Sequence, residues 1–305
     1  MKVAAIDIGT NSMRLLIADY EKNDIVDFQK IAKVTKIGRG VDSNRFICKQ
    51  AIDENLEALS DFVDTARKNN AEKITIMATS ALRDAKNSEE FLSKAYERTG
   101  IRVVVMSGDM EAKLGFLGAG KLISEKEPTL TIDIGGGSTE FIVGNVAGDI
   151  LFSKSENVGC VRLTEKFLHS DPPTEFETSC MNEFVYRTFK DTIDILNDFS
   201  LSDAIGIGGT FTSASSMLQG LKIYSPLKVH NSKIYIDDVE NLYASLSRMD
   251  LSQKQMITGL QANRADVIFA GVAIIRIIMR ELHLPYITVS EYDNLEGLIF
   301  DLMKQ

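Results

Sequence analysis

The sequence predicts an α/β protein built from two related halves. The chain has 305 residues, 44% of them hydrophobic, which is long for a single hydrophobic core. In both halves, short apolar segments of strand type are followed by segments whose apolar residues recur at helical spacing. A glycine-rich phrase near the N-terminus also returns 126 positions later (7 to 133), as expected of a duplicated domain.

The repeated phrase joins two apolar segments through an aspartate, a glycine and small polar residues. Residues 6–12 read IDIGTNS, and residues 132–138 read IDIGGGS. The aspartate of each copy lies within an apolar segment, and burying a carboxylate is costly unless it has a partner or a ligand. The alternative is a pair of unrelated glycine-rich hairpin turns, but the common register of the two copies favours a duplication.

Both copies have the composition of a phosphate-binding loop. Glycine and other small residues let successive backbone N–H groups approach an anion closely. Hydroxyl and amide side chains add donors, and the two aspartates can hold a hard cation or its waters. We therefore expect the two loops to face one another and to bind a phosphate chain with its divalent cation. The residues are Asp7, Gly9, Thr10, Asn11 and Ser12 in the first copy, and Asp133, Gly136, Gly137, Ser138 and Thr139 in the second.

The two halves repeat a similar order of elements. In the first half we expect strands near residues 3–8, 13–18, 27–36, 73–78 and 102–106, and helices at 49–69, 88–99 and 110–122. In the second half we expect strands at 130–134, 140–144, 150–155, 203–207 and 286–290, and helices at 161–169, 174–199, after 210, at 264–283 and at the C-terminus.

The domain boundary is expected at a short polar segment. Residues 124–128 (SEKEP) are the best linker candidate, which gives domains at 1–123 and 124–305. The first domain would carry the first loop, and the second domain would carry the second loop. Whether the last helix, about residues 292–305, packs back on the first domain is left open.

Composition and charge exclude several classes of protein. A net charge of −9 argues against nucleic acid as a partner. The three cysteines, Cys48, Cys160 and Cys180, are widely spaced and predict neither a disulfide framework nor a zinc site, which favours the cytoplasm. The sequence starts without the apolar core of a signal peptide, and its longest nearly apolar run, residues 267–279, is too short to span a bilayer. We expect no membrane partner, and the sequence leaves a homodimer open.

Seven segments along nearly the whole chain carry a resemblance to a known family. They are AAIDIGTNSMRLLIA, SALRDA, SGDMEAKLGFLG, TIDIGGGSTEFIVG, NVGCVRLTEKF, GIGGT and NRADVIFAG, in that order. Together they closely resemble the exopolyphosphatase / guanosine pentaphosphate phosphohydrolase family of the actin-like, sugar-kinase and heat-shock ATPase superfamily. The resemblance implies two ribonuclease-H-like (actin-like) domains flanking an interdomain cleft, and Mg²⁺-dependent release of terminal orthophosphate.

The resemblance also implies catalytic roles. Glu111 stands at the second Glu of the family's SGxEEA segment and would take a proton from the water that attacks the terminal phosphorus. Its plainer interpretation is an acid near a helix N-terminus. Arg83 of SALRDA would bind phosphate bidentately, with a surface ion pair to Asp84 or a nearby acid as the alternative. Arg14 is a candidate for lining the path of a longer anion, with a solvated side chain as the alternative.

The same resemblance implies a metal site and a third loop. Asp133 and Glu140, seven residues apart across the second loop, correspond to the pair that the family uses around Mg²⁺, and Asp7 is a further candidate ligand. Mn²⁺ and an additional monovalent cation are left open. Gly208, Gly209 and Thr210 of GIGGT would meet the distal part of the ligand, although many strand-to-helix turns have this composition.

The chain departs from the family pattern at two places. One is Met110, which stands where the first Glu of SGxEEA usually is, so that neighbour of Glu111 cannot be essential here. At the other, residues 290–297 read SEYDNLEG where the family usually shows SDYGLREG, which puts Asp293 at the glycine and Leu295 at the arginine. We expect hydrolysis of the terminal phosphoanhydride of inorganic polyphosphate, with guanosine pentaphosphate as the alternative substrate. A kinase of the same superfamily and a non-catalytic polyphosphate- or alarmone-binding protein are the alternatives from other classes.

Overall fold

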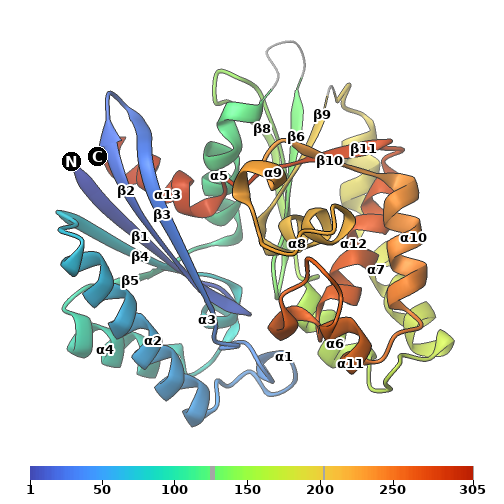
Figure 1. The fold of residues 1–305 in the computed structure, drawn as a ribbon, viewed down its shortest axis with the longest axis horizontal. Helices are drawn as coiled ribbons and strands as arrows, with labels where there is room; N and C mark the ends of the chain where they lie inside the picture. The colour runs from blue at the N-terminus through green and yellow to red at the C-terminus, as the bar shows by residue number, and fades with distance from the viewer. Residues whose placement is uncertain (124–127, 202, 305) are drawn as a thin grey trace. The chain divides into compact units, whose positions relative to one another are not determined.

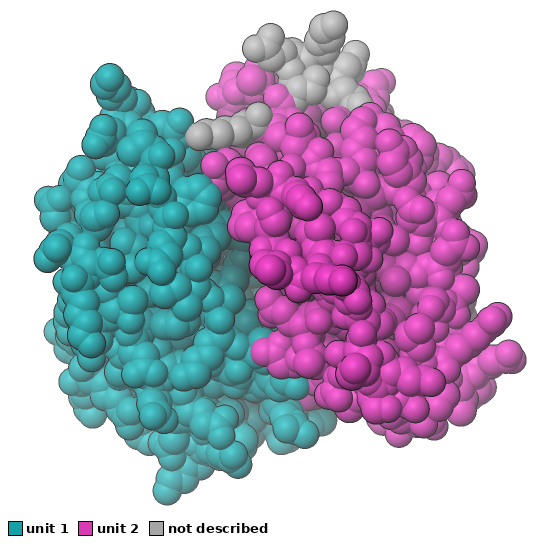
Figure 2. Space-filling model, in the orientation of Figure 1, with its two compact units in different colours: residues 1–118, 293–305 teal, residues 119–292 magenta. Residues whose placement is uncertain are grey.

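Two compact units make up the chain. The computed structural model describes residues 1–123, 128–201 and 203–304. Unit 1 consists of Met1–Gly118 and Asp293–Gln305, and unit 2 consists of Ala119–Tyr292, as the two colours of Figure 2 show. Unit 1 therefore contains the last helix of the chain together with its N-terminal part. Residues 124–127 of the linker expected at 124–128 lie outside the described residues.

A five-stranded mixed sheet forms the centre of unit 1, in the order β3-β2-β1-β4-β5 (Figure 1). The strands β1 (Lys2–Ile8), β2 (Ser12–Glu21) and β3 (Asp24–Val34) form an antiparallel meander. The strands β4 (Lys73–Ala78) and β5 (Val103–Val105) continue the sheet in parallel with β1. The central strand β1 is apolar on both faces because helices cover the sheet on both sides.

Alternate residues of β1 face two different hydrophobic clusters. Ala4 and Ile6 pack in one cluster with α2 (Lys49–Lys68) and α4 (Ser88–Thr99). Val3 and Ala5 pack in the other with residues of α5 and α13. The helices α5 and α13 span Gly108–Ala119 and Asn294–Lys304, and the short helices α1 and α3 span Val41–Asn44 and Ser80–Asp84.

Unit 2 repeats the strand order of unit 1 and adds one strand. Its six-stranded sheet has the order β10-β11-β9-β6-β7-β8 (Figure 1). From β8 to β11 this order corresponds to β3-β2-β1-β4-β5, with antiparallel pairing in the meander and parallel pairing beyond it. The strands are β6 (Thr129–Ile134), β7 (Thr139–Gly144), β8 (Ile150–Glu156), β9 (Asp203–Ile207), β10 (Ser232–Tyr235) and β11 (Tyr286–Val289). The α/β class and the internal duplication are therefore confirmed.

The helices of unit 2 pack around α12 (Ile268–Glu281), whose apolar residues are almost all buried. This helix contacts α6, α7, α8 and α10. It begins four residues later than the sequence predicted, because Ala262–Arg264 forms a 3₁₀ helix. The other helices are α6 (Cys160–Phe167), α7 (Glu175–Asn197), α8 (Gly208–Leu218), α9 (Pro226–Val229), α10 (Ile236–Leu246), α11 (Leu251–Gln255) and the 3₁₀ helix Gly120–Leu122. None of the helices in the described ranges has the length and apolar content that crossing a membrane requires.

Two glycines bring α5 and α13 into backbone contact. A Cβ atom at Gly297 of α13 would lie 1.9 Å from the carbonyl oxygen of Leu114 in α5. A Cβ atom at Gly118 of α5 would lie 1.9 Å from the carbonyl oxygen of Asp293, which precedes α13. The start of α13 is thus fixed against the helix that carries Glu111.

We predict that Gly297→Ala destabilises the protein by about 1–3 kcal/mol, because the added methyl group forces the two backbones apart. Urea unfolding of the full chain measures this change in the free energy of unfolding. Gly120→Ala is the control, since a Cβ at Gly120 meets nothing within 4 Å. A Gly297→Ala protein as stable as this control would contradict the close approach.

Candidate active site

The first loop connects β1 to β2 and is closed by its own backbone. The N–H of Gly9 donates to the carbonyl of Ser12 at 3.0 Å. The carbonyl groups of Thr10 and Asn11 accept hydrogen bonds of 3.0–3.1 Å from N–H groups in residues 35–38. The end of β3 and the segment after it therefore hold the loop in place.

The second loop has the same closure. The N–H of Gly135 donates to the carbonyl of Ser138, also at 3.0 Å. The carbonyl groups of Gly135 and Gly136 accept hydrogen bonds of 2.9–3.0 Å from N–H groups at residues 160–162, where α6 begins. The two similar sequence phrases thus form loops that are closed by the same backbone hydrogen bond.

Donors in both loops remain available for a ligand. Within the described ranges, the N–H groups of Thr10, Asn11, Gly136 and Gly137 donate to no protein acceptor. The side-chain amide of Asn11 is buried, and its nitrogen and oxygen have no partner there either. Buried polar groups in native proteins are normally hydrogen-bonded. These unsatisfied donors are the arrangement that an anion would complete.

Two further glycines allow the neighbouring segments to approach the loops. A Cβ at Gly38 would lie 2.2 Å from Cγ2 of Thr10. A Cβ at Gly159 would lie 2.4–2.5 Å from the backbone of Gly136 and Gly137. The sequence analysis did not single out Gly38, and it assigned no role to Gly159, although Gly159 lies in the NVGCVRLTEKF segment that carries the resemblance.

The predicted catalytic residues Arg83 and Glu111 lie together in unit 1. Glu111 is in the first turn of α5 and is 7% exposed. Nη1 of Arg83 donates to Oε2 of Glu111 at 3.0 Å and to the carbonyl of Met106 at 2.9 Å. The structure therefore pairs Arg83 with an acid, as the alternative interpretation had it, and that acid is Glu111 rather than Asp84. The helix that carries Arg83 begins at the first loop, where the hydroxyl groups of Thr10 and Ser80 are 3.1 Å apart.

Asp7 and Arg14 face one another across the β1–β2 hairpin. Nε and Nη2 of Arg14 donate to Oδ2 of Asp7 at 3.1 and 2.5 Å, and Nη1 donates to Oδ2 of Asp293. The other oxygen of Asp7, Oδ1, is buried and has no hydrogen-bond partner in the described part of the chain. Burial raises the pKa of Asp7 above its ordinary value, although Arg14 opposes the shift. Arg14, which the sequence offered as an anion ligand, thus engages two carboxylates.

Asp133 and Glu140 are the corresponding cross-strand pair of unit 2. Both side chains are buried, and Oε1 of Glu140 accepts a hydrogen bond of 2.7 Å from the Ser155 hydroxyl. Oδ1 of Asp133 lies against the start of α8, 2.5 Å from the position of a Cβ at Gly208. The Thr210 hydroxyl donates to the last carbonyl of β6 at 2.8 Å. Unit 2 therefore brings together the second loop, its two carboxylates and the GIGGT turn.

Three further predicted residues have structural contacts of their own. The Thr139 hydroxyl donates to the carbonyl of Val158 at 2.6 Å, and Ser138 is buried beside it. The guanidinium of Arg264 packs on Gly209, where a Cβ would lie 2.3 Å from Nη1. An arginine beside the N-terminus of α8 adds positive charge at the third loop.

The carboxylates fit a magnesium ion that is partly coordinated by phosphate. The described residues contain no group of three or more His, Cys, Asp or Glu side chains arranged to hold a metal. Magnesium in proteins is usually held by one or two carboxylates together with substrate phosphates and water. Like charges directly opposite one another in a sheet are destabilising, so Asp133 and Glu140 would gain from a cation. The orphaned Oδ1 of Asp7 is a further oxygen donor.

Cys160 lies beside the second loop, where its backbone N–H donates to the carbonyl of Gly135. Its side chain is buried at the start of α6. Burial raises the pKa of the Cys160 thiol to about 11, so that the thiol stays protonated at neutral pH.

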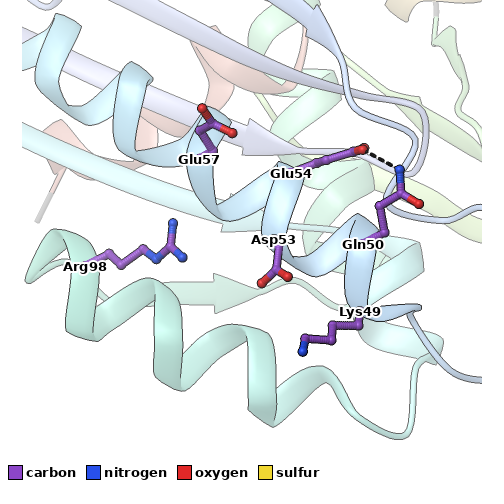
Figure 3. Close-up of a pocket in the computed structure, with 6 residues that line it drawn as sticks. All are labelled: Lys49, Gln50, Asp53, Glu54, Glu57 and Arg98. Carbon is purple, nitrogen blue, oxygen red and sulfur yellow. Dashed lines mark hydrogen bonds between the residues drawn. The ribbon is translucent and has the colours of Figure 1, made fainter.

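A surface depression of about 710 Å³ in unit 1 lies away from these residues. It is formed by α2 and α4, and Figure 3 shows Gln50 hydrogen-bonded to Glu54 along α2, with Arg98 reaching across from α4. Its lining contains none of the predicted site residues and consists of Lys49, Gln50, Asp53, Glu54, Glu57 and Arg98.

We predict that Gly38→Ala lowers the free energy of unfolding by about 1–2 kcal/mol, because the new methyl group meets the Thr10 side chain. Thr10→Ser removes the opposing methyl group. The double variant should therefore recover most of the loss in urea unfolding. If the two changes are simply additive, the packing of Gly38 on the first loop is not as described.

Known proteins with similar sequences and folds identify the family of this chain. A profile of the Ppx/GppA phosphatase family matches residues 16–305. Exopolyphosphatase 2 of Mycobacterium tuberculosis is 33% identical over 99% of this chain and 98% of its own length. The solved exopolyphosphatase of Cytophaga hutchinsonii superposes with a TM-score of 0.90 and 27% identity, covering 100% of this chain and 98% of the other.

A Ppx/GppA family member from Aquifex aeolicus superposes with a TM-score of 0.83 and 26% identity, again over 100% of this chain and 98% of the other. The expected α/β fold of two actin-like domains is confirmed by these superpositions. The chain belongs to the Ppx/GppA phosphatase family.

Proposed function

We propose that this protein is an exopolyphosphatase, which hydrolyses the terminal phosphoanhydride of inorganic polyphosphate and releases orthophosphate. The observation that carries the proposal is the likeness, over nearly the full length of both chains, to a protein named Exopolyphosphatase 2. The ion pair between the half-buried Arg83 and the buried Glu111 supports hydrolysis rather than binding alone.

The two loops bind the phosphate chain in this proposal. The N–H groups of residues 10, 11, 136 and 137 donate to phosphate oxygens, and the Asn11 amide and the hydroxyl groups of Ser12 and Ser138 add donors. The third loop, Gly208–Thr210, meets a more distal phosphate through the N-terminus of α8 and the Arg264 guanidinium. These loop contacts come from backbone N–H groups and neutral side chains, so they position the ligand without a charged side chain in the loops.

Glu111 acts as the general base. The ionised carboxylate is the form that accepts the hydrogen bond from Arg83, and it is also the form that can take a proton from water. Direct attack by this water on the terminal phosphorus needs no covalent phospho-enzyme. Arg83 orients Glu111 through Nη1, and its remaining N–H groups bind oxygens of the terminal phosphate.

Asp133, Glu140 and Asp7 are the proposed ligands of Mg²⁺, with Mn²⁺ as a substitute. The ion, when bound, neutralises phosphate oxygens and the charge that develops on the leaving group. Without an opposing cation, these buried carboxylates would repel a polyanion, so the phosphate ligand and the cation are expected to bind together.

Guanosine pentaphosphate is the second candidate substrate, because the matching family is described as Ppx/GppA phosphatases. The same residues would remove its terminal phosphate by the same chemistry. Phosphate release from short polyphosphate, long polyphosphate and guanosine pentaphosphate, measured side by side, decides between the substrates. The proposal expects the highest kcat/KM for polyphosphate, and a higher value for guanosine pentaphosphate would reverse the assignment.

We predict that Glu111→Gln lowers kcat for phosphate release by about 10²- to 10⁴-fold, because the amide cannot accept a proton from water. Affinity for tripolyphosphate, measured by equilibrium titration with Mg²⁺ present, should change little. Asp109→Asn is the matched control, since Asp109 is an exposed carboxylate in the same turn of α5. Equal losses in the two variants, or unimpaired turnover in Glu111→Gln, would remove Glu111 from the mechanism.

A further inference from the structure

One guanidinium in unit 1 faces two buried carboxylates. Arg14 donates through Nε and Nη2 to Asp7 and through Nη1 to Asp293. Asp7 is 3% exposed and Asp293 is 5% exposed, so water does little to stabilise either charge. A single positive charge is therefore divided between two carboxylates.

Asp293 is fixed at this place by the start of α13. Its Oδ1 accepts the N–H of Leu295 at 3.0 Å, and its own N–H donates to Oε2 of Glu296 at 2.9 Å. Its carbonyl lies against Gly118 of α5. The carboxylate is thus pre-positioned beside Arg14 and does not depend on the arginine for its orientation.

The neighbouring cation, Lys30, forms an ion pair with another acid, Glu296. Lys30 of β3 lies 2.7 Å from Oε1 of Glu296, which is 1% exposed. The contacts described here thus join two cations, Arg14 and Lys30, to three buried carboxylates. Both oxygens of Asp293 accept a hydrogen bond, from the N–H of Leu295 and from Arg14, whereas Oδ1 of Asp7 is buried without a hydrogen-bond partner in the described part of the chain. The shortage of positive charge therefore falls on Asp7.

The β6–β7 hairpin of unit 2 has two carboxylates at the positions that correspond to Asp7 and Arg14. The spacing that relates Asp7 to Asp133 also relates Arg14 to Glu140, since both differ by 126 positions. The β6–β7 hairpin thus pairs two carboxylates where the β1–β2 hairpin pairs a carboxylate with an arginine. Asp293, which stands where the resembled pattern has glycine, gives the first hairpin a second carboxylate from outside the sheet.

We propose that Asp293 is a positioning residue that engages Arg14, leaves Oδ1 of Asp7 without a compensating charge, and so makes the first loop require a divalent cation. The inference rests on the proposed function in one respect, namely that the cation arrives with a phosphate ligand. A buried carboxylate oxygen without a compensating charge is a ligand that magnesium takes together with phosphate oxygens and water.

Binding of Mn²⁺ alone to the full-length protein tests this inference. In a calorimetric titration without phosphate, the component that disappears in Asp7→Asn reports the first loop. Asp293→Asn should weaken this component on the order of tenfold, because Arg14 then compensates Asp7 fully. Asparagine caps a helix about as well as aspartate, so α13 should remain intact. Asp301→Asn, a change of the same chemistry within α13, is the control and should leave the affinity unchanged.

Arg14→Met should change the affinity in the opposite direction. With the guanidinium removed, both carboxylates lack compensation, and Mn²⁺ should bind on the order of tenfold more tightly and raise Tm more than in the wild-type protein. A merely structural role of Asp293 would weaken binding in both variants. Unchanged binding in Asp293→Asn, or a loss in both variants, would overturn the inference. If the wild-type protein releases no orthophosphate from polyphosphate while these effects on Mn²⁺ binding are observed, the result contradicts the proposed function and leaves the inference about Asp293 standing.

Discussion

A buried carboxylate at the end of a central strand is the constraint on which both units depend. Asp7 and Asp133 lie in strands that are apolar on both faces, where an isolated charge would be strongly unfavourable. Each is opposed, seven residues later, by the residue across its hairpin. Unit 1 places Arg14 there and unit 2 places Glu140, so the two hairpins share a backbone but differ in charge. In the proposed function, a phosphate ligand would bind the free N–H groups of the loops, and its cation would compensate the buried carboxylates.

The backbone around each loop is held by contacts from segments that are distant in the sequence. Residues 35–38 support the first loop, and residues 160–162 support the second. Glycines at the points of contact allow this proximity, and Gly297 does the same for α13 on α5. Because α5 carries Glu111 and α13 follows Asp293, the proposed general base and the charge balance of the first hairpin depend on the same pair of helices.

Local patterns in the sequence predicted most of the fold and the hairpins of the site. Strands at residues 73–78 and 203–207 have the predicted bounds, and the repeated phrase corresponds to two hairpins closed by the same hydrogen bond. Strand β10 and the short helices were missed, because short elements carry little periodicity. Helix α10 was missed as well, although it is as long as α8 and α13, which the sequence predicted. The roles of Gly38, Gly159 and Asp293 were missed because each depends on a contact with a distant segment. Only the departure at Asp293 from the resembled pattern marked that position in advance.

The central claim is that the two loops bind the same phosphate ligand together with a divalent cation. The most direct measurement follows the backbone amide resonances of residues 9–12 and 135–138 by NMR while tripolyphosphate and Mg²⁺ are added. The account predicts that the amides of both loops shift with a common dissociation constant, and that tripolyphosphate without Mg²⁺ produces much weaker binding. Shifts confined to one loop, or absent from both, would contradict it.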